Sequence, residues 1–216
     1  KPLPPDPQEP ARIAATAAKW KLRYAVLTSP TRDDLPDGGS AQFSATVRAL
    51  RDAVPGIGAE MLVPDFAGDH AALETALACR PEVFAHNVET VPQLYSKARA
   101  GADYRRSLKV LENAAKRGAL VKSGFMVGLG ETGGQMKTLL SDLASTGCAL
   151  LTIGQYLAPS KLHCPVEKYY EPAEFDALKE LALEAGLKNV VSGPLVRSSY
   201  KAGEQYRAYC AQLPRR

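Results

Sequence analysis

Acidic and hydroxyl side chains follow the first short apolar run of this sequence, at the point where a strand would end. After Ala25–Leu27 comes a charged segment that contains Thr28, Ser29, Arg32, Asp33, Asp34, Asp37 and the pair Gly38-Gly39. A short apolar run bounded by turn residues is typical of a buried parallel strand. Because the loops after such strands hold the chemistry of parallel sheets, we expect this segment to bind a ligand. A solvated connection to the next helix is the alternative, and local spacing leaves it open.

The run Val83–Ala85 ends in a second polar group, within His86-Asn87-Val88-Glu89-Thr90. Asn87 and Glu89 stand two positions apart, so both point to the same side of an extended chain. An amide and a carboxylate in this arrangement could bind sugar hydroxyls. The alternatives are a glutamate that caps a helix and an amide that is hydrogen-bonded in the core. The wholly apolar strand before them favours a binding site.

Two further strand ends carry weaker signals. Gly124 and Gly128 allow the backbone to approach a ligand closely, and Glu131 follows them, although a glycine-rich turn before a helix is common. Gln155 stands at the next strand end, where an apolar residue would be expected, and a structural hydrogen bond explains it nearly as well. The carboxylates of these loops could supply acid–base chemistry or a site for a hard metal ion. The sequence does not distinguish the two.

Composition and charge exclude several classes of function. The chain has 216 residues, of which 45% are hydrophobic, so it can bury the core of one or two domains. Its net charge of +4, with no Lys/Arg run that stands out apart from the terminal Arg215-Arg216, does not suggest a nucleic-acid partner. No apolar run is long enough to cross a bilayer, so no membrane partner is expected. The cysteines lack CxxC or CxxxC spacing, which argues against a zinc site or a locally encoded cluster and indicates a reducing compartment; they are Cys79, Cys148, Cys164 and Cys210.

Hydrophobic periodicity predicts helices that alternate with strands. Helices are expected at 11–20, 42–53, 69–78, 92–99, 104–117, 134–145, 172–185 and 201–211, and strands at 25–27, 59–63, 83–85, 119–127, 150–153 and 189–191. This order is typical of an α/β fold with parallel strands and right-handed crossovers, either a partial barrel or an open doubly wound sheet. The first element is a helix where such units begin with a strand, so we expect that a preceding strand has been cut away or lost.

Taken together, the motifs resemble those of lipoyl synthases, which are radical S-adenosylmethionine (SAM) enzymes. The matching segments cover nearly all of the chain up to about Glu204 and are, in order, LTSPTRDDLPDGG, VPDF, FAHNVETVPQLY, KSGFMVGLGET, LTIGQYLAPS and SGPLVRSSYKAGE. The resemblance implies a partial (β/α)6 TIM-like barrel whose first strand is missing. In that fold the proline-rich residues 1–10 lead into a barrel at 11–200, and residues 201–216 form a carboxy-terminal helix and tail.

The resemblance also implies an activity. Lipoyl synthases insert two sulfur atoms, at carbons six and eight, into an octanoyl chain held on a lysine of a carrier protein. They use two [4Fe-4S] clusters: one cleaves SAM to a deoxyadenosyl radical that abstracts hydrogen, and an auxiliary cluster donates sulfur. The partner would be an octanoylated lipoyl-carrier domain or the H protein of glycine cleavage. The compartment would be the bacterial cytoplasm, or the mitochondrion or plastid of a eukaryote.

Roles for individual residues follow from the same resemblance. Thr28, Ser29 and the Asp33–Gly39 loop, with Asp37, Gly38 and Gly39, would surround the methionine end of SAM. Asn87 and Glu89 would face its ribose. Gly124–Glu131, which matches GxIxGxxE with Met126 in the Ile place, would line the adenine, and Gln155 would also bind SAM. Ser198 would be a hydroxyl ligand of the auxiliary cluster, with Arg197 beside it for the substrate; the alternative for Ser198 is to cap the last helix.

The chain departs from the family at the cluster ligands. The CxxxCxxC motif and the three-cysteine motif of the auxiliary cluster are absent, and thiolates are required to hold such clusters. We therefore expect this chain alone to be inactive, as the larger part of a working enzyme. Pro30-Thr31 also stands where the family usually has Val-Asp. Two other functions stay open: a cluster-free, inactive relative that binds SAM or the carrier protein, and an unrelated barrel lyase or aldolase that uses a metal or a Schiff-base lysine, for which Lys122 would be the candidate.

Overall fold

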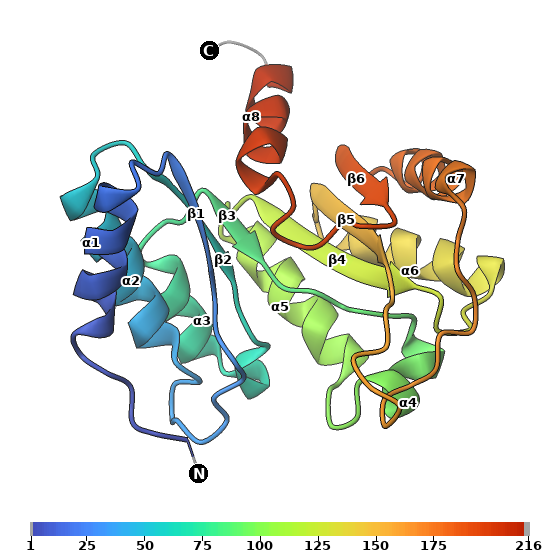
Figure 1. The fold of residues 1–216 in the computed structure, drawn as a ribbon, viewed down its shortest axis with the longest axis horizontal. Coiled ribbons are helices and arrows are strands. Elements are labelled where there is room, and N and C mark those ends of the chain that lie inside the picture. The colour runs from blue at the N-terminus through green and yellow to red at the C-terminus, as the bar shows by residue number, and fades with distance from the viewer. Residues whose placement is uncertain (1, 214–216) are drawn as a thin grey trace.

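Six parallel strands form one sheet, and their order in the sheet equals their order in the chain (Figure 1). The computed structural model describes residues 2–213, so Lys1 and residues 214–216 of the predicted tail lie outside the described residues. The strands are β1 (Tyr24–Thr28), β2 (Gly58–Leu62), β3 (Val83–Ala85), β4 (Val121–Val127), β5 (Leu150–Gln155) and β6 (Asn189–Gly193). Within the described part of the chain, β1 pairs only with β2, and β6 only with β5. The sheet is therefore an open partial barrel, which confirms the predicted fold class.

The helices lie in the positions that the alternation predicts. They are α1 (Glu9–Lys19), α2 (Ser40–Ala53), α3 (His70–Leu77), α4 (Tyr95–Ala98), α5 (Tyr104–Lys116), α6 (Gly133–Ser145), α7 (Pro172–Glu184) and α8 (Ala202–Gln212). Single 3-10 turns precede α3 and α4, at Phe66–Gly68 and Pro92–Leu94. The single helix predicted at 92–99 is therefore wrong in detail, because its first turn is 3-10 and α4 has only four residues.

Local sequence signals account for several helix starts. The side chain of Asp69 accepts a hydrogen bond from the backbone N–H of Ala71 and caps α3 as predicted. The side chain of Asp103 caps α5 in the same way. Thr132 and Gln135 form a reciprocal capping box at the start of α6. Each cap fixes where the chain leaves the loop that follows a strand, and so fixes the length of the loops at the carboxyl edge.

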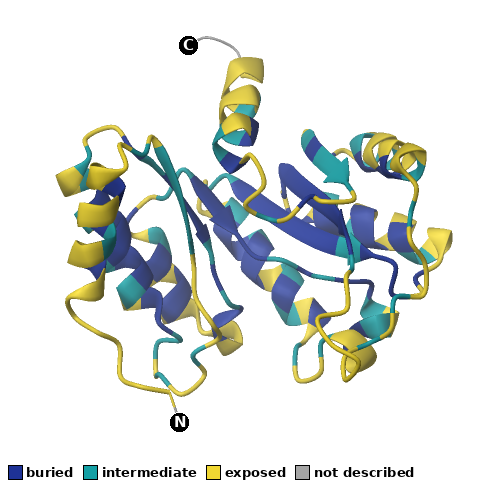
Figure 2. Ribbon diagram, in the orientation of Figure 1, coloured by how far each residue is buried: buried dark blue, intermediate teal, exposed yellow. Residues whose placement is uncertain are grey.

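The core lies between the outer face of the sheet and helices α2 to α7, where the strands are buried (Figure 2). Side chains alternate between the two faces of each strand. The outward set is mostly apolar and buried and includes Met61, Phe84, Leu151 and Ile153. The inward set on the central strands includes the polar or small residues Glu60, Lys122, Gly124 and Thr152. This concave face is covered in part by α8 and the segment before it (Figure 1), so these polar residues lie inside the barrel.

Candidate functional site

The chain after β3 stays attached to β4 and brings two polar side chains to the concave face. The backbone N–H of Glu89 donates to the carbonyl of Gly124, and the N–H of Met126 donates to the carbonyl of Glu89, at 3.1 and 2.8 Å. Glu89 has a φ of +64°, in the left-handed region that non-glycine residues rarely adopt. Such strained positions gather at ligand sites. The strain here lies in the residue that carries the carboxylate.

Asn87 has a buried side-chain oxygen, Oδ1, without a hydrogen-bond partner among the described residues. Its amide group does hydrogen-bond to Glu89. Burial raises the pKa of the Glu89 carboxyl, against that hydrogen bond and the charge of Arg99. A buried acceptor without a donor costs roughly 1–3 kcal/mol, and native structures leave few of them. Asn87 and Glu89 therefore present acceptors that a ligand with hydroxyl or N–H groups would satisfy.

Gly124 leaves the space in front of these two side chains. A Cβ at this position would lie 2.6 Å from Oγ1 of Thr152 and 3.0 Å from Oδ1 of Asn87. Both distances are shorter than side chains tolerate, so any other residue would push Asn87 or Thr152 aside. Because the φ of Gly124 is ordinary, the requirement for glycine is one of space and not of backbone conformation.

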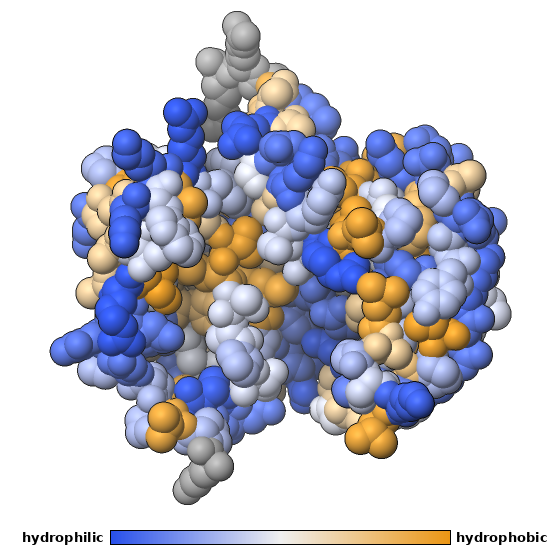
Figure 3. All heavy atoms as spheres, in the orientation of Figure 1, coloured by the Kyte–Doolittle hydropathy of each residue, from blue (hydrophilic) through white to orange (hydrophobic). Residues whose placement is uncertain are grey.

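A concave pocket of about 230 Å³ forms around this group. Its lining comes from β2, the loop after β3, β4, β5 and the segment 194–201, and consists of Leu62, Asn87, Glu89, Gly124, Phe125, Met126, Thr152, Gly154, Val196, Arg197 and Ser198. Gly154 lets the segment 194–201 approach β5 closely, because a Cβ at this position would collide with the carbonyl oxygen of Val196. Figure 3 shows the concave face hollowed, with apolar residues on its floor. Larger hollows of about 620 and 700 Å³ lie elsewhere, and their linings contain none of the predicted site residues.

Three predicted site residues build loops at the carboxyl edge and do not line this pocket. The carboxylate of Glu131 accepts from the backbone N–H groups of Gly128 and Leu129, at 2.7 and 2.9 Å. The side chain of Gln155 donates to the carbonyl oxygen of Lys168 and accepts from the N–H of Tyr170, at 2.9 and 3.0 Å. Gly128, at a φ of +106°, has no room for a Cβ against Gln155. The structural hydrogen bond weighed for Gln155 therefore accounts for its polar atoms.

The loop after β1 (residues 29–39, here the β1 loop) satisfies its polar groups internally. Asp37 accepts from the N–H groups of Gly39 and Ala41, at 3.0 and 2.9 Å, at the start of α2. Burial raises the pKa of the Asp37 carboxyl, but these bonds outweigh it and lower the pKa. Arg32 forms a 2.7 Å ion pair with Asp34. The remaining predicted residues of this region are exposed on it or support its turn; they are Thr28, Ser29, Asp33, Gly38 and Gly39.

All these predicted residues lie at the carboxyl edge of the sheet, but they form two groups. Thr28, Ser29 and Gly39 line a separate groove of about 360 Å³ under the proline-rich leading segment. Asn87, Glu89 and Gly124 lie in the concave pocket together with Arg197 and Ser198, which come from far along the chain. Parallel strands explain the shared edge, and the curvature of the sheet separates the two groups.

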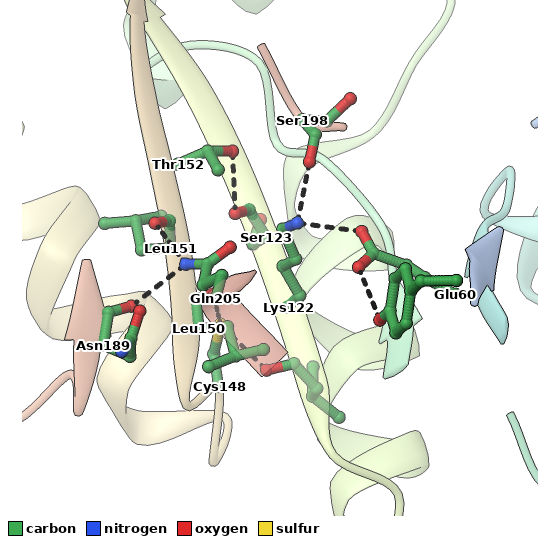
Figure 4. A network of polar contacts seen from close by, with 12 residues as sticks. Glu60, Lys122, Ser123, Cys148, Leu150, Leu151, Thr152, Asn189, Ser198 and Gln205 are labelled. Carbon is green, nitrogen blue, oxygen red and sulfur yellow. Dashed lines mark hydrogen bonds and ion pairs between the residues drawn. The ribbon is translucent and has the colours of Figure 1, made fainter. Parts of the chain in front are cut away.

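Ser198 lies in the pocket wall and is not a helix cap. Helix α8 begins at Ala202, after Lys201 in a left-handed conformation, without a side-chain cap. The carbonyl oxygen of Ser198 accepts a hydrogen bond from Nζ of Lys122, at 2.7 Å. Its hydroxyl points away from Lys122 (Figure 4). The guanidinium of Arg197 donates to the neighbouring carbonyl of Val196 and also lines the pocket. The alternative of a capping serine is therefore wrong.

Sequence reasoning missed the buried charges beneath Ser198. Lys122 of β4 forms a 2.8 Å ion pair with Glu60 of β2, and both side chains are 1% exposed. Tyr24 of β1 donates to the same carboxylate at 3.2 Å. The signal was present, because a single charged residue stands in each of the otherwise apolar strands GAEML and VKSGFMV, apart from one serine. Charged residues are almost never fully buried unless they are paired.

The cysteines do not converge. Cys79 and Cys148 are buried in the core, Cys164 is half-buried and Cys210 is exposed. Across residues 2–213, no three His, Cys, Asp or Glu side chains are grouped to hold a metal ion, and no helix is long and apolar enough to span a membrane. Thiolate ligands for a cluster therefore do not assemble from these residues.

Comparison with known proteins defines the class. The sequence profile of the Radical SAM superfamily matches residues 1–143. The solved structure of methylornithine synthase superposes with a TM-score of 0.63 over 98% of this chain and 74% of that chain, at 16% identity, which shows the fold alone. With an open parallel barrel and a pocket at its carboxyl edge, the chain has the architecture and sequence of a radical SAM protein.

Closer relatives define the family. The lipoyl synthase of Trichlorobacter lovleyi is 53% identical over 204 residues, which are 94% of this chain and 72% of the relative. The lipoyl synthase of Nitratidesulfovibrio vulgaris is 50% identical over 207 residues, or 96% of this chain and 70% of the relative. The chain belongs to the lipoyl synthase family.

Proposed function

We propose that this chain is the SAM-binding barrel of a lipoyl synthase, which inserts two sulfur atoms into an octanoyl chain on a carrier-protein lysine. The observation that supports the SAM site is the unpartnered Oδ1 of Asn87 beside the buried carboxylate of Glu89. Identity of 50–53% over 94–96% of the chain favours this function over a cluster-free binding domain or an unrelated lyase. Residues 11–200 are the barrel unit in this proposal, and residues 201–216, of which the described part forms α8, follow it.

The concave pocket fits the nucleoside part of SAM. The ribose hydroxyls would donate to Asn87 and Glu89, and Gly124 would let the sugar lie against the sheet. Met126 supplies an apolar surface for a base. The β1 loop would contact the methionine end through Thr28, Ser29 and the backbone of Gly38-Gly39. Gly128, Glu131 and Gln155 would act through loop shape, because their polar groups already have partners. Bound SAM supplies the one-electron chemistry that activates a substrate C–H bond.

Equilibrium binding of SAM to the 216-residue chain tests this proposal. Asn87→Ala removes the unpartnered acceptor and should weaken binding about tenfold, the value of one good hydrogen bond. Asn113→Ala, a buried asparagine on α5 outside the concave pocket, is the matched control and should bind SAM like the parent chain. Equal affinity of all three chains would contradict the assignment of the site.

The cysteine ligands of the iron–sulfur clusters would come from outside these 216 residues. We propose that the complete enzyme holds two [4Fe-4S] clusters, and that this chain alone binds none and makes no lipoyl group. Anaerobic reconstitution, followed by measurement of iron and sulfide, should give no stoichiometric uptake. Uptake of four iron atoms per chain would show that the dispersed cysteines had been misjudged.

Ser198 is the one cluster ligand that we assign to this chain, and Arg197 beside it would bind the acyl substrate or its carrier. The carrier would be an octanoylated lipoyl domain or the glycine-cleavage H protein. When the chain is joined to the amino-terminal part of a lipoyl synthase that carries both cysteine motifs, Ser198→Ala should preserve SAM cleavage and impair completed sulfur insertion. Undiminished lipoyl formation would remove the ligand assignment.

A further inference from the structure

The concave face contains a buried ion pair that the proposed chemistry does not use. Nζ of Lys122 lies 2.8 Å from Oε1 of Glu60, and the two side chains are 1% exposed. Burying such a pair gains little stability over apolar residues of the same size, whereas breaking it by removing one partner is strongly destabilising. Stability alone therefore explains this ion pair poorly, and the other contacts of Lys122 and Glu60 indicate what else the pair does.

Those contacts lead to the segment 194–201, which carries Ser198. Nζ of Lys122 also donates to the carbonyl oxygen of Ser198 at 2.7 Å (Figure 4). The other oxygen of Glu60 accepts from the hydroxyl of Tyr24 at 3.2 Å. The ring of Tyr24 in turn packs 5.8 Å from that of Tyr206 on α8. Side chains of β1, β2 and β4 are thus linked by hydrogen bonds to the backbone carbonyl of Ser198.

This carbonyl is the place where the sheet holds the segment. The backbone hydrogen bonds of the segment itself are local, from the N–H of Val196 to Gly193 and from the N–H of Tyr200 to Arg197. Among the described residues, the hydrogen bond from Lys122 is the one that joins 194–201 to a strand other than β6, from which the segment leaves the sheet. An ammonium donor makes a stronger bond to a carbonyl than a neutral donor does, and its burial keeps water from competing.

We propose that Lys122, held by Glu60, is a positioning residue that fixes the backbone of Ser198 so that its hydroxyl faces the concave pocket. The carbonyl of Ser198 points down to the ammonium, and the hydroxyl is left on the opposite side (Figure 4). We call the hydrogen bond from Lys122 to the carbonyl of Ser198 the tether. The consequence for catalysis rests on the proposed role of Ser198, whereas the tether does not depend on that role. Lys122 is not among the residues that line the concave pocket.

Hydrogen exchange of the 216-residue chain tests the tether without any cofactor. Lys122→Met alone leaves Glu60 buried and unpaired and is expected to unfold readily. The double variant Glu60→Gln/Lys122→Met removes both charges at similar volume and should fold. In it, the amides of Val196 and Tyr200 should exchange at least tenfold faster, while those of α6 stay unchanged. Lys109→Met/Glu112→Gln, an exposed pair on α5, is the control and should alter neither region. Unchanged exchange at residues 195–201 in the folded double variant would overturn the proposal.

Product analysis of the enzyme that carries both cysteine motifs gives the second readout. Loss of positioning should raise the ratio of SAM cleaved to lipoyl group formed at least tenfold in the double variant. A double variant that lost both reactions in equal proportion would show a merely structural role and would also overturn the proposal. Ser198→Ala keeps the carbonyl and should retain slow exchange, so its product ratio tests the ligand role of Ser198 separately from the tether.

Discussion

The β1 loop and the concave pocket lie at the same edge of one sheet and treat their polar groups in opposite ways. In the β1 loop, Asp37 binds the N–H groups that open α2, and Asp34 pairs with Arg32. In the pocket, Asn87 keeps a buried oxygen without a partner and Glu89 adopts a strained backbone. Carboxylates that bind their own backbone shape a loop, whereas acceptors that the fold leaves unsatisfied are available to a ligand.

The same contrast separates two neighbouring residues at the end of β3. The ring of His86 is fully buried on the outer side, between the carbonyl of Val63 at 2.8 Å and the hydroxyl of Ser107 at 3.0 Å. Asn87, on the inner side, has an acceptor left over. One peptide step thus divides a polar residue that the core satisfies from one that the proposed SAM site would use.

The largest expected effect comes from protonating His86. Burial and the nearby Arg99 lower the pKa of His86 from 6.5 to about 4, against its bond to Val63 and the charge of Asp65. Between these pH values His86 is protonated in the unfolded chain but not in the folded chain. The free energy of unfolding therefore falls by about 3 kcal/mol as the pH drops from 6.5 to 4. Urea denaturation at several pH values measures this free energy. In His86→Gln it should no longer fall between pH 6.5 and 4 for this reason, whereas His163→Gln, at an exposed histidine, should keep the fall.

Removal of the pocket carboxylate should come next. Glu89→Ala is expected to weaken SAM binding about 100-fold, because hydrogen bonds to a charged group contribute roughly 1.5–3 kcal/mol. Asp34→Ala in the β1 loop should change the affinity less than threefold. Titration calorimetry compares the two, and equal losses would erase the contrast between the regions.

A methyl group in the pocket should have a smaller effect. Gly124→Ala places a Cβ 2.6 Å from Oγ1 of Thr152, so SAM affinity should fall about tenfold, and the displaced side chain should also lower the thermal midpoint. Gly133→Ala at the start of α6 meets nothing within 4 Å and serves as the control. Full affinity in Gly124→Ala would mean that the ligand lies elsewhere on the concave face.

The smallest effect is expected for the cap in the β1 loop. Asp37→Ala should destabilise the fold by about 1 kcal/mol at neutral pH, the usual value of a lost helix cap. Because the pKa of Asp37 is lowered from 3.8, its contribution is present above that pH and is lost as the pH falls through the folded value. The difference between variant and parent should therefore shrink in acid, as measured by chemical denaturation. A constant difference would show that the charge of Asp37 does not matter.

Much of the fold was predictable, because alternation of strands and helices is a local property. The strand 83–85 was predicted residue for residue, and the α3 cap at Asp69 was predicted from its type. That Asn87 and Glu89 lie on the same face was also predicted from their spacing. The tether was not predicted, since Lys122 and Ser198 are joined by a contact across 76 positions. Nor could spacing show that the side-chain amide of Gln155 forms hydrogen bonds with the backbone of Lys168 and Tyr170.

The order of the strands has a consequence for how the protein folds during its synthesis. Each strand pairs with the one that left the ribosome just before it, so the sheet can grow from β1 to β6 as synthesis proceeds. The wall formed by Val196, Arg197 and Ser198 emerges only after all six strands. Tyr24 is synthesised before the other five described strands, and its ring is covered only once Tyr206 of α8 has been made. A chain released before residue 194 would contain all six described strands, but its pocket would lack one wall.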